Sequence, residues 1–287
     1  MPNSQEVRPR RSFIFAPGLQ PEMFPKALKT GTDIVCIDLE DAIAPQHKDL
    51  ARERTMTIFQ DPQADDGVER IVRINCLRTI DGQNDVRALV EAGENAPPAI
   101  MLPKVKSADE VRGMDELLSE HNMPTRLHVI IETNQALEAA YDIAHASERI
   151  DAMFFGGVDM AAELRAKNAW LPLLYARSRI VHAAASVGVD AIDVPYLDLN
   201  DLDGMKEEAR QAADLGFSGK GAIHPSQIGI LNDIFSPSEA EVAHAQRIVD
   251  AFAKAETGLV VVDGKLIEKP VLREMHRLLA IAERLQQ

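Results

Sequence analysis

The chain has 287 residues, of which 46% are hydrophobic and 26% are charged, and its formal net charge is −14. The composition is typical of a folded globular protein, and the acidic balance argues against nucleic-acid binding, which requires a basic surface. No hydrophobic run approaches the roughly 18 residues that cross a bilayer, and the chain does not open on a signal-peptide pattern. Because the chain has only two cysteines, we expect a cytoplasmic protein without a disulfide framework. From the charge and the hydrophobic runs we expect no nucleic-acid partner and no membrane partner.

Eight short hydrophobic runs alternate with longer segments of helical pattern. The runs cover residues 12–17, 33–40, 70–75, 99–104, 126–132, 152–157, 190–197 and 219–225. Helical patterns between them include residues 21–29, 108–120, 135–146, 171–187 and 202–214. Such alternation predicts βα units around a parallel sheet, and eight strands fit a closed barrel better than an open sheet. We therefore expect an α/β fold, a TIM (β/α)₈ barrel, as the catalytic domain over residues 10–235.

The pattern changes in the last fifty residues. Ser, Pro, Ser and Glu at positions 236–239 predict a capped helix that runs to about residue 254. A hairpin that turns on Asp263-Gly264 and a helix over residues 271–286 follow. A segment of this size is too small to be an independent domain. We expect residues 236–287 to form a C-terminal helix-hairpin-helix extension that packs on the barrel or on a neighbouring subunit.

Polar residues stand where the predicted strands end, and in a TIM barrel the active site lies at these ends. The set comprises Pro17-Gly18, Asp38, Glu40, Asp41, Arg73, Asn75, Lys104, Glu132, Asp159 and His224. Several carboxylates at one barrel mouth repel one another unless they are protonated or bind a cation. Oxygen ligands without thiolates suit a hard cation, so the pattern predicts a Mg²⁺ site.

Each of the main candidates also has a structural interpretation. Glu132 could lie in a polar loop before a helix, and Asp159 could be an acid favoured by a helix N-terminus. Arg73 lies within a hydrophobic run, so its partner is either a barrel carboxylate or a substrate carboxylate. Lys104 is either a Schiff-base nucleophile, if its pKa is lowered, or a counter-ion to neighbouring acids.

Several motifs occur together in a fixed order: RRSFIFAPG, IVCIDLEDAIAP, VRIN, LPKV, IIET, FFGGVDMAAEL and GKGAIHPSQI. In this combination the chain resembles the HpcH/HpaI aldolase and citrate lyase superfamily, specifically its citrate lyase β subunit-like branch, which includes malyl-CoA and citramalyl-CoA lyases. The resemblance extends from about residue 10 to 271. It implies a TIM barrel and Mg²⁺-dependent cleavage or formation of a carbon–carbon bond between an acyl thioester enolate and a 2-oxo acid.

The resemblance also assigns roles at the barrel mouth. Glu132 of IIET and Asp159 of GGVDM match the metal ligands, and Arg73 of VRIN matches the residue that holds the 2-oxo acid and polarises its oxygen. Gly157 of the same GGVDM motif is expected to contact substrate along with these three residues.

Three further positions match residues around the metal. Glu40 and Asp41 match a pair near the metal's waters, and Lys104 matches a structural neighbour instead of a nucleophile. We expect Glu40 and Asp41 to orient those waters without binding the metal directly.

The chain departs from the family pattern in three places. Glu268 stands where relatives carry an Asp that enters a neighbouring subunit's site and takes part in proton transfer. Leu19-Gln20 replaces an Arg of the first loop, which weakens the case for the usual thioester carrier, and Val158 replaces a Glu. By the resemblance we still expect Glu268 to be catalytic, and the protein to be a homo-oligomer, a trimer or hexamer.

The sequence is compatible with three functions. The first is a Mg²⁺-dependent lyase acting on a malyl-, citramalyl- or citryl-type thioester of coenzyme A or of an acyl carrier protein. The second is a metal-dependent aldolase acting on free 4-hydroxy-2-oxo acids. The third is a binding subunit that keeps the Mg²⁺ and 2-oxo acid site but needs a partner for turnover.

Overall fold

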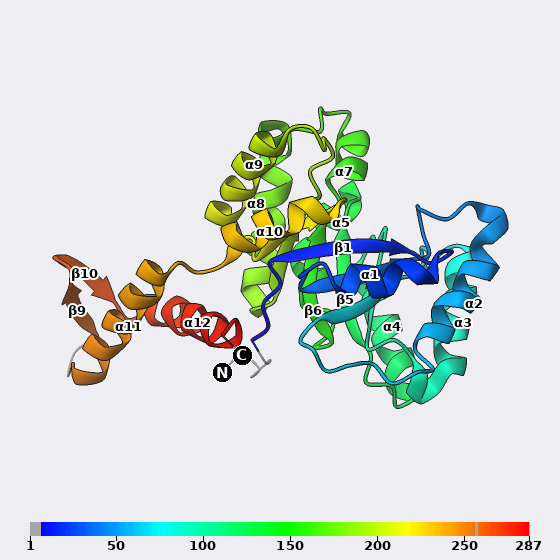
Figure 1. Ribbon diagram of the computed structural model, residues 1–287, viewed down its shortest axis with the longest axis horizontal. Coiled ribbons are helices and arrows are strands. Elements are labelled where there is room, and N and C mark those ends of the chain that lie inside the picture. Colours follow the sequence, from blue (N-terminus) through cyan, green and yellow to red (C-terminus); the bar gives the residue numbers. More distant parts are fainter. Residues whose placement is uncertain (1–6, 256–257, 287) are drawn as a thin grey trace. The chain divides into compact units, whose positions relative to one another are not determined.

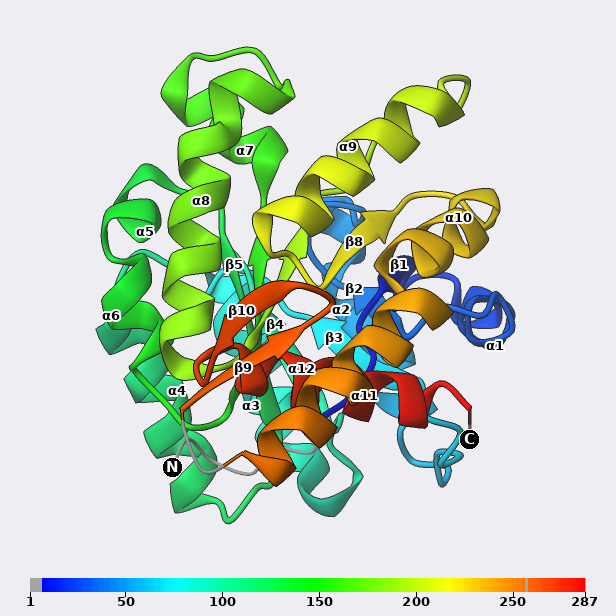
Figure 2. The same ribbon diagram turned by 90° about the vertical axis from the view of Figure 1, so that its left-hand side faces the viewer.

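Eight parallel strands close into a barrel in the computed structural model, which describes residues 7–255 and 258–286. The strands are β1 (Ser12–Pro17), β2 (Ile34–Asp38), β3 (Glu69–Arg73), β4 (Ala99–Leu102), β5 (Arg126–Ile131), β6 (Ile150–Phe155), β7 (Asp190–Asp193) and β8 (Gly219–Ala222). Each strand pairs with the next along the chain, and β8 pairs with β1 (Figures 1 and 2). The predicted TIM barrel is confirmed.

Helices surround the strands in Figure 2. They are α1 (Phe24–Leu28), α2 (Lys48–Ile58), α3 (Ile80–Ala92), α4 (Ala108–Glu120), α5 (Asn134–Glu138), α6 (Ala140–Ala144), α7 (Gly157–Leu164), α8 (Trp170–Val187), α9 (Leu202–Leu215) and α10 (Pro225–Phe235), with 3₁₀ turns at Pro21–Met23, Pro45–His47 and Gly93–Asn95. The pattern over residues 135–146 predicted one helix, but the structure has two, because the backbone of Ala139 leaves the helical conformation.

Strand β2 ends earlier than its hydrophobic pattern predicted. The Asp38 carboxylate accepts hydrogen bonds from the backbone amides of Glu40, at 2.9 Å, and Ala42, at 3.0 Å. These bonds turn the chain out of the strand, as a carboxylate often does when it binds nearby backbone amides. Residues 39–41 therefore lie in the loop at the barrel mouth.

The barrel interior has a hydrophobic middle. Alternate strand residues point inward, and they form one cluster of Phe13, Ile34, Cys36, Ile71, Ala99, Met101, Ile130, Ala152, Phe154 and Ile192. Charged residues lie beyond this cluster at both ends of the strands. We call the cluster at the N-terminal ends, around Arg10, Glu69 and Asp190, the floor. We call the cluster at the C-terminal ends, around Asp38, Arg73 and Glu132, the mouth.

The described residues divide into two compact units. The first is Arg10–Ile234, and the second combines residues 7–9 with the described residues from Phe235 onward. The second unit contains α11 (Glu239–Lys254), β9 (Leu259–Val262), β10 (Lys265–Glu268) and α12 (Val271–Arg284), drawn orange to red in Figure 1. Its own hydrophobic core contains Ala245, Ile248, Val262 and Met275. Asp263 and Gly264 both have positive φ, as the predicted hairpin turn requires.

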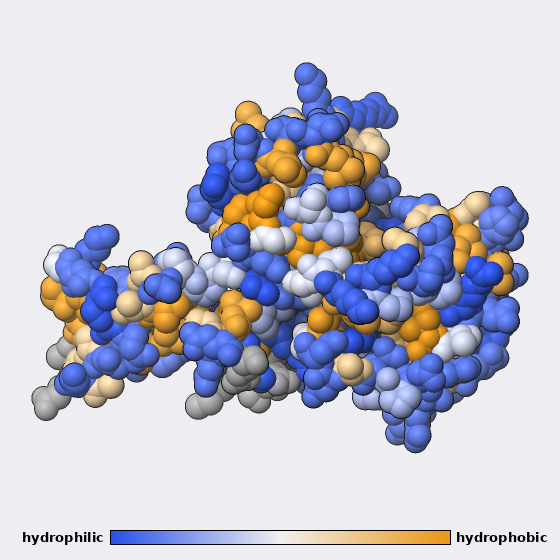
Figure 3. Space-filling view, viewed as in Figure 1, coloured by the Kyte–Doolittle hydropathy of each residue, from blue (hydrophilic) through white to orange (hydrophobic). Residues whose placement is uncertain are grey.

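Hydrophilic residues predominate on the face shown in Figure 3, and hydrophobic residues appear there in separate patches. In the part of the chain that the structure describes, no helix combines the length and the hydrophobicity that a membrane crossing needs.

Candidate functional site

A cavity of about 280 Å³ opens at the C-terminal ends of the barrel strands. Its lining residues are Phe13, Phe15, Asp41, Arg73, Met101, Ile130, Glu132, Phe154, Phe155, Gly156, Val158, Asp159, Val194, Pro195, Leu197 and Ile223. Arg73, Asp41, Glu132 and Asp159, which the sequence singled out, thus reach one cavity. Gly156 lines it, whereas Gly157, the predicted substrate contact, does not; Gly157 packs near Phe155 and Val194 at the start of α7.

Arg73 is bound by a carboxylate that carried no assigned role. Its Nε and Nη2 donate to the two oxygens of Asp38, both at 2.8 Å, and its guanidinium lies 4.5 Å from the centre of the Phe15 ring. Burial opposes the charge of Asp38, but the hydrogen bonds and charge of Arg73 outweigh it and lower the pKa of Asp38. Of the two alternatives for Arg73, the structure favours the barrel carboxylate as its resting partner.

The remaining nitrogen of Arg73 is held less tightly. Nη1 lies 3.4 Å from Oε2 of Glu40, beyond normal hydrogen-bond length. Arg73 lines the cavity. The Asp38 pair therefore fixes the orientation of the guanidinium and leaves Nη1 as the nitrogen best able to contact a ligand.

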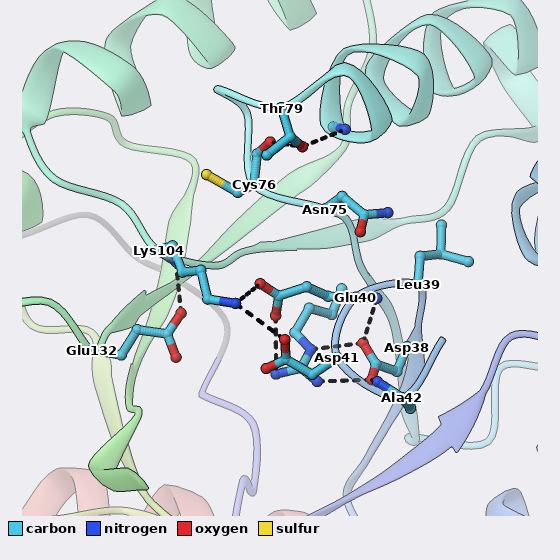
Figure 4. A network of polar contacts seen from close by, with 12 residues as sticks. Asp38, Leu39, Glu40, Asp41, Ala42, Asn75, Cys76, Thr79, Lys104 and Glu132 are labelled. Carbon is cyan, nitrogen blue, oxygen red and sulfur yellow. Dashed lines mark hydrogen bonds and ion pairs between the residues drawn. The ribbon is translucent and has the colours of Figure 1, made fainter. Parts of the chain in front are cut away.

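Lys104 is a counter-ion and not a free amine. Its Nζ lies 2.7 Å from Oε1 of Glu40 and 3.1 Å from Oδ1 of Asp41. Figure 4 shows the ammonium group pointing toward these two acids, with Leu39 pointing away from them. Burial alone would lower the pKa of Lys104, but the two carboxylates raise it. A Schiff-base nucleophile requires an uncharged amine, so this geometry disfavours that role.

Glu132 is buried at the mouth with one oxygen bound and the other free for a ligand. Oε1 accepts a hydrogen bond from the backbone amide of Lys104 at 2.6 Å. Oε2 points toward Gly156, where even a β-carbon would lie 2.6 Å away. Burial, and then the charges of Glu40 and Asp159, raise the pKa of Glu132 to about 8. Burial and the neighbouring anions thus disfavour the charged form of this carboxyl group, and a bound cation would stabilise that form.

Asp159 completes this side of the cavity from the first turn of α7. Within the described residues, no Lys, Arg or His side chain forms an ion pair with Asp159 or Glu132, whereas Glu40 and Asp41 both pair with Lys104. The two predicted ligands are therefore the two acids that lack a protein cation.

The chemistry of this donor set fits Mg²⁺. Asp38, Glu40, Asp41, Glu132 and Asp159 supply only carboxylate oxygens, and Arg73 and Lys104 are the described cations that pair with this group. An excess of hard oxygen donors around a cavity with room for water and substrate is the setting in which Mg²⁺ binds.

The predicted tail acid lies in the other compact unit. Glu268 is exposed and ends strand β10, opposite Leu259 of β9. Its predicted entry into a neighbouring subunit's site stays a prediction.

The other two departures from the family pattern lie at the barrel mouth and in the first loop. Val158 lines the cavity, and the carbonyl of Leu19 accepts a hydrogen bond from Arg54 at 2.6 Å. An arginine thus reaches the first loop from α2.

Comparisons with known proteins identify the family of the chain. Residues 11–225 match the family model described as HpcH/HpaI aldolase/citrate lyase. The chain is 35% identical to the citrate lyase subunit beta of Escherichia coli (strain K12), over 97% of this chain and 95% of that one. It is 31% identical to the L-malyl-CoA/beta-methylmalyl-CoA lyase of Cereibacter sphaeroides, over 96% of both.

A solved structure shares the architecture. Mycobacterium tuberculosis CitE, in complex with magnesium, acetoacetate and coenzyme A, superposes with a TM-score of 0.76 at 30% identity, over 98% of this chain and 99% of that one. The resemblance inferred from the motifs is confirmed: the chain belongs to the HpcH/HpaI aldolase/citrate lyase family.

Proposed function

We propose that the protein is a Mg²⁺-dependent carbon–carbon lyase that cleaves or forms a short 3-hydroxyacyl-CoA, with an acyl-CoA and a 2-oxo acid as the other side of the reaction. The observation that carries this proposal is the placement of Glu132 and Asp159 beside Arg73 in one cavity, where neither acid pairs with a cation of the described residues. Relatives named citrate lyase subunit beta and malyl-CoA lyase support the reaction class. The CitE complex supports magnesium and coenzyme A as ligands.

The residues at the mouth have distinct roles in the proposed reaction. Glu132 and Asp159 would hold Mg²⁺, which would supply Lewis acidity and make the substrate hydroxyl more acidic. Arg73, fixed by Asp38, donates from Nη1 to the oxygen that becomes the carbonyl of the 2-oxo acid. Glu40 and Asp41, oriented by Lys104, accept hydrogen bonds from water in the cavity.

The proton of the substrate hydroxyl needs an acceptor as the carbon–carbon bond breaks. We assign this step to Glu268 of a neighbouring copy in a cytoplasmic trimer or hexamer. Glu268 is exposed at the end of β10. An acid supplied by another subunit requires at least a dimer.

The test is an assay of 2-oxo acid release from malyl-, citramalyl- and citryl-CoA, with Mg²⁺ and after EDTA treatment. We expect one of the three to be cleaved, and EDTA to abolish turnover until Mg²⁺ is restored. Cleavage of free 4-hydroxy-2-oxo acids alone would establish the aldolase alternative. Mg²⁺-dependent binding of a 2-oxo acid without turnover of any thioester would establish the partner-dependent subunit.

The same assay tests the role of Glu268. Glu132→Ala subunits and Glu268→Ala subunits should each be inactive alone, and their mixture should recover part of the activity, because some interfaces then combine an intact mouth with an intact tail. Failure to recover activity in a mixture shown to exchange subunits would contradict action between subunits.

A further inference from the structure

The cavity at the mouth has two chemically different sides. Arg73, Glu132 and Asp159 form the polar side. The rest of the lining includes hydrophobic side chains at or just after the ends of β6, β7 and β8, which we call the hydrophobic side: Phe155, Val194, Pro195, Leu197 and Ile223. A bound molecule therefore meets both polar groups and hydrocarbon.

Positive charge in the cavity is scarce and already engaged. Among the described residues that line it, Arg73 is the one cation, and it is paired with Asp38 and Glu40. The nearby Lys104 is paired with Glu40 and Asp41. Neither cation is free to neutralise a second anionic group on a ligand.

These charges limit the number of carboxylates that a 2-oxo acid can carry. Its 2-oxo group and adjoining carboxylate match Mg²⁺ and Arg73, as in the proposed function. A second carboxylate, as in oxaloacetate, would face either the hydrophobic side or the acid Asp41. Burial of a carboxylate without a partner, or beside like charges, is strongly unfavourable.

Building on the proposed lyase function, we propose that the 2-oxo acid partner has a single carboxylate and a hydrogen or small alkyl substituent, as glyoxylate and pyruvate have, and that oxaloacetate is rejected. The thioester is then of the malyl or citramalyl type and not of the citryl type. The hydrophobic side of the cavity receives the substituent, and the absence of a second cation among the described lining residues excludes the dicarboxylate.

The test measures binding of glyoxylate, pyruvate and freshly prepared oxaloacetate by calorimetry in saturating Mg²⁺. We expect glyoxylate or pyruvate to bind at least about 10-fold more tightly than oxaloacetate, because only the dicarboxylate leaves a charge without a partner. Binding is measured without a thioester, so the result does not depend on turnover.

Two matched variants sharpen the test. Leu197 lines the cavity and is 50% exposed, whereas Leu199, in the same loop and 45% exposed, does not line it. Leu197→Arg places a cation on the hydrophobic side and should improve oxaloacetate binding relative to pyruvate by about 10-fold. Leu199→Arg adds the same charge outside the cavity and should leave the ratio unchanged.

The outcomes separate this inference from the function on which it rests. If wild-type protein binds oxaloacetate as tightly as pyruvate, or more tightly, the single-carboxylate inference is overturned and the lyase function stands. If none of the three 2-oxo acids binds in the presence of Mg²⁺, the proposed function itself fails. An equal response of Leu197→Arg and Leu199→Arg would show that the hydrophobic side does not select the substituent.

Discussion

The floor and the mouth of the barrel both bury charges, but they balance them differently. At the floor, Arg10 lies 2.6 Å from Glu69 and 2.7 Å from Asp190, and Arg126 lies 2.6 Å from Asp151. At the mouth, the predicted metal ligands Glu132 and Asp159 have no such partner among residues 7–255 and 258–286. A balanced cluster needs no added ion, and removing one of its partners leaves a buried charge uncompensated, whereas an acid-rich cluster is completed by a bound cation.

The floor also shows why a set of possible ligands is not always a metal site. Glu69, His128 and Asp151 bring ligand atoms within 4.8 Å of one another. Both carboxylates, however, pair with arginines, and Arg10 lies between them. A cation there would be repelled by guanidinium groups, so the floor has the geometry of a ligand set without the charge that favours a metal.

The largest expected difference between the two ends is in stability. Arg10→Met leaves Glu69 and Asp190 buried without their cation and should lower the free energy of unfolding by about 3–5 kcal/mol. Glu132→Gln removes a buried carboxylate whose charge is opposed by burial, Glu40 and Asp159, so at neutral pH the metal-free protein should lose no stability and should gain up to about 3 kcal/mol. Urea denaturation measures both.

Added Mg²⁺ should stabilise the Arg10→Met variant but not the Glu132→Gln variant. At about 100 times its dissociation constant, a ligand that binds only the folded state adds about 2.7 kcal/mol of stability. Wild type and Arg10→Met should gain this increment, and Glu132→Gln should not. Equal losses of stability at the floor and the mouth, or a Mg²⁺ increment in Glu132→Gln, would contradict the comparison.

The next largest expected effect is a pH dependence of the unfolding free energy that arises at the floor. Burial opposes the charge of Glu69, but Arg10 and His128 outweigh it and lower the pKa of Glu69 from 4.5 to about 2. Because the folded pKa is the lower one, this stabilisation is present above pH 4.5 and is lost as the pH falls toward 2. Between neutral pH and pH 2 it should decrease by about 3 kcal/mol.

The Glu69→Gln variant isolates that contribution from the other carboxylates. The difference in unfolding free energy between wild type and Glu69→Gln should shrink as the pH falls from 4.5 to 2. Denaturation curves at several pH values measure it. A difference that stayed constant over this range would show that Glu69 is not held ionised by Arg10.

The smallest expected effect concerns the mouth alone. A β-carbon at Gly156 would lie 2.6 Å from Oε2 of Glu132, so Gly156→Ala must displace this carboxylate. We expect Mg²⁺ affinity to fall by about 10-fold to 100-fold, the usual effect of disturbing the groups that orient a ligand. Calorimetric titration with Mg²⁺ measures the change.

Gly113→Ala is the matched control for this substitution. Gly113 lies in α4, where a β-carbon would meet nothing within 4 Å. The change should leave Mg²⁺ affinity intact and raise stability by up to about 1 kcal/mol, since alanine favours helix over glycine. If Gly156→Ala bound Mg²⁺ as tightly as Gly113→Ala, the role of Gly156 in placing Glu132 would be wrong.

Much of the architecture could be predicted without the structure. Hydrophobic runs and helical patterns are local, and turn residues such as Asp263-Gly264 act on their own neighbours, so the eight strands, the barrel and the hairpin followed from the sequence. Because parallel strands of a barrel present their C-terminal ends on one face, the collection of Arg73, Glu132 and Asp159 in one cavity was predictable as well.

Only the tertiary structure decided how the charges pair. Asp38 and Arg73 are 35 residues apart, the backbone amide of Lys104 reaches Glu132 across 28 residues, and Arg10 reaches Asp190 across 180. Sequence spacing identifies strand ends but not the side chains that meet when the barrel closes. The sequence by itself determined which charged residues stand at the strand ends, and closure of the barrel determined which acids are neutralised and which remain to bind a cation.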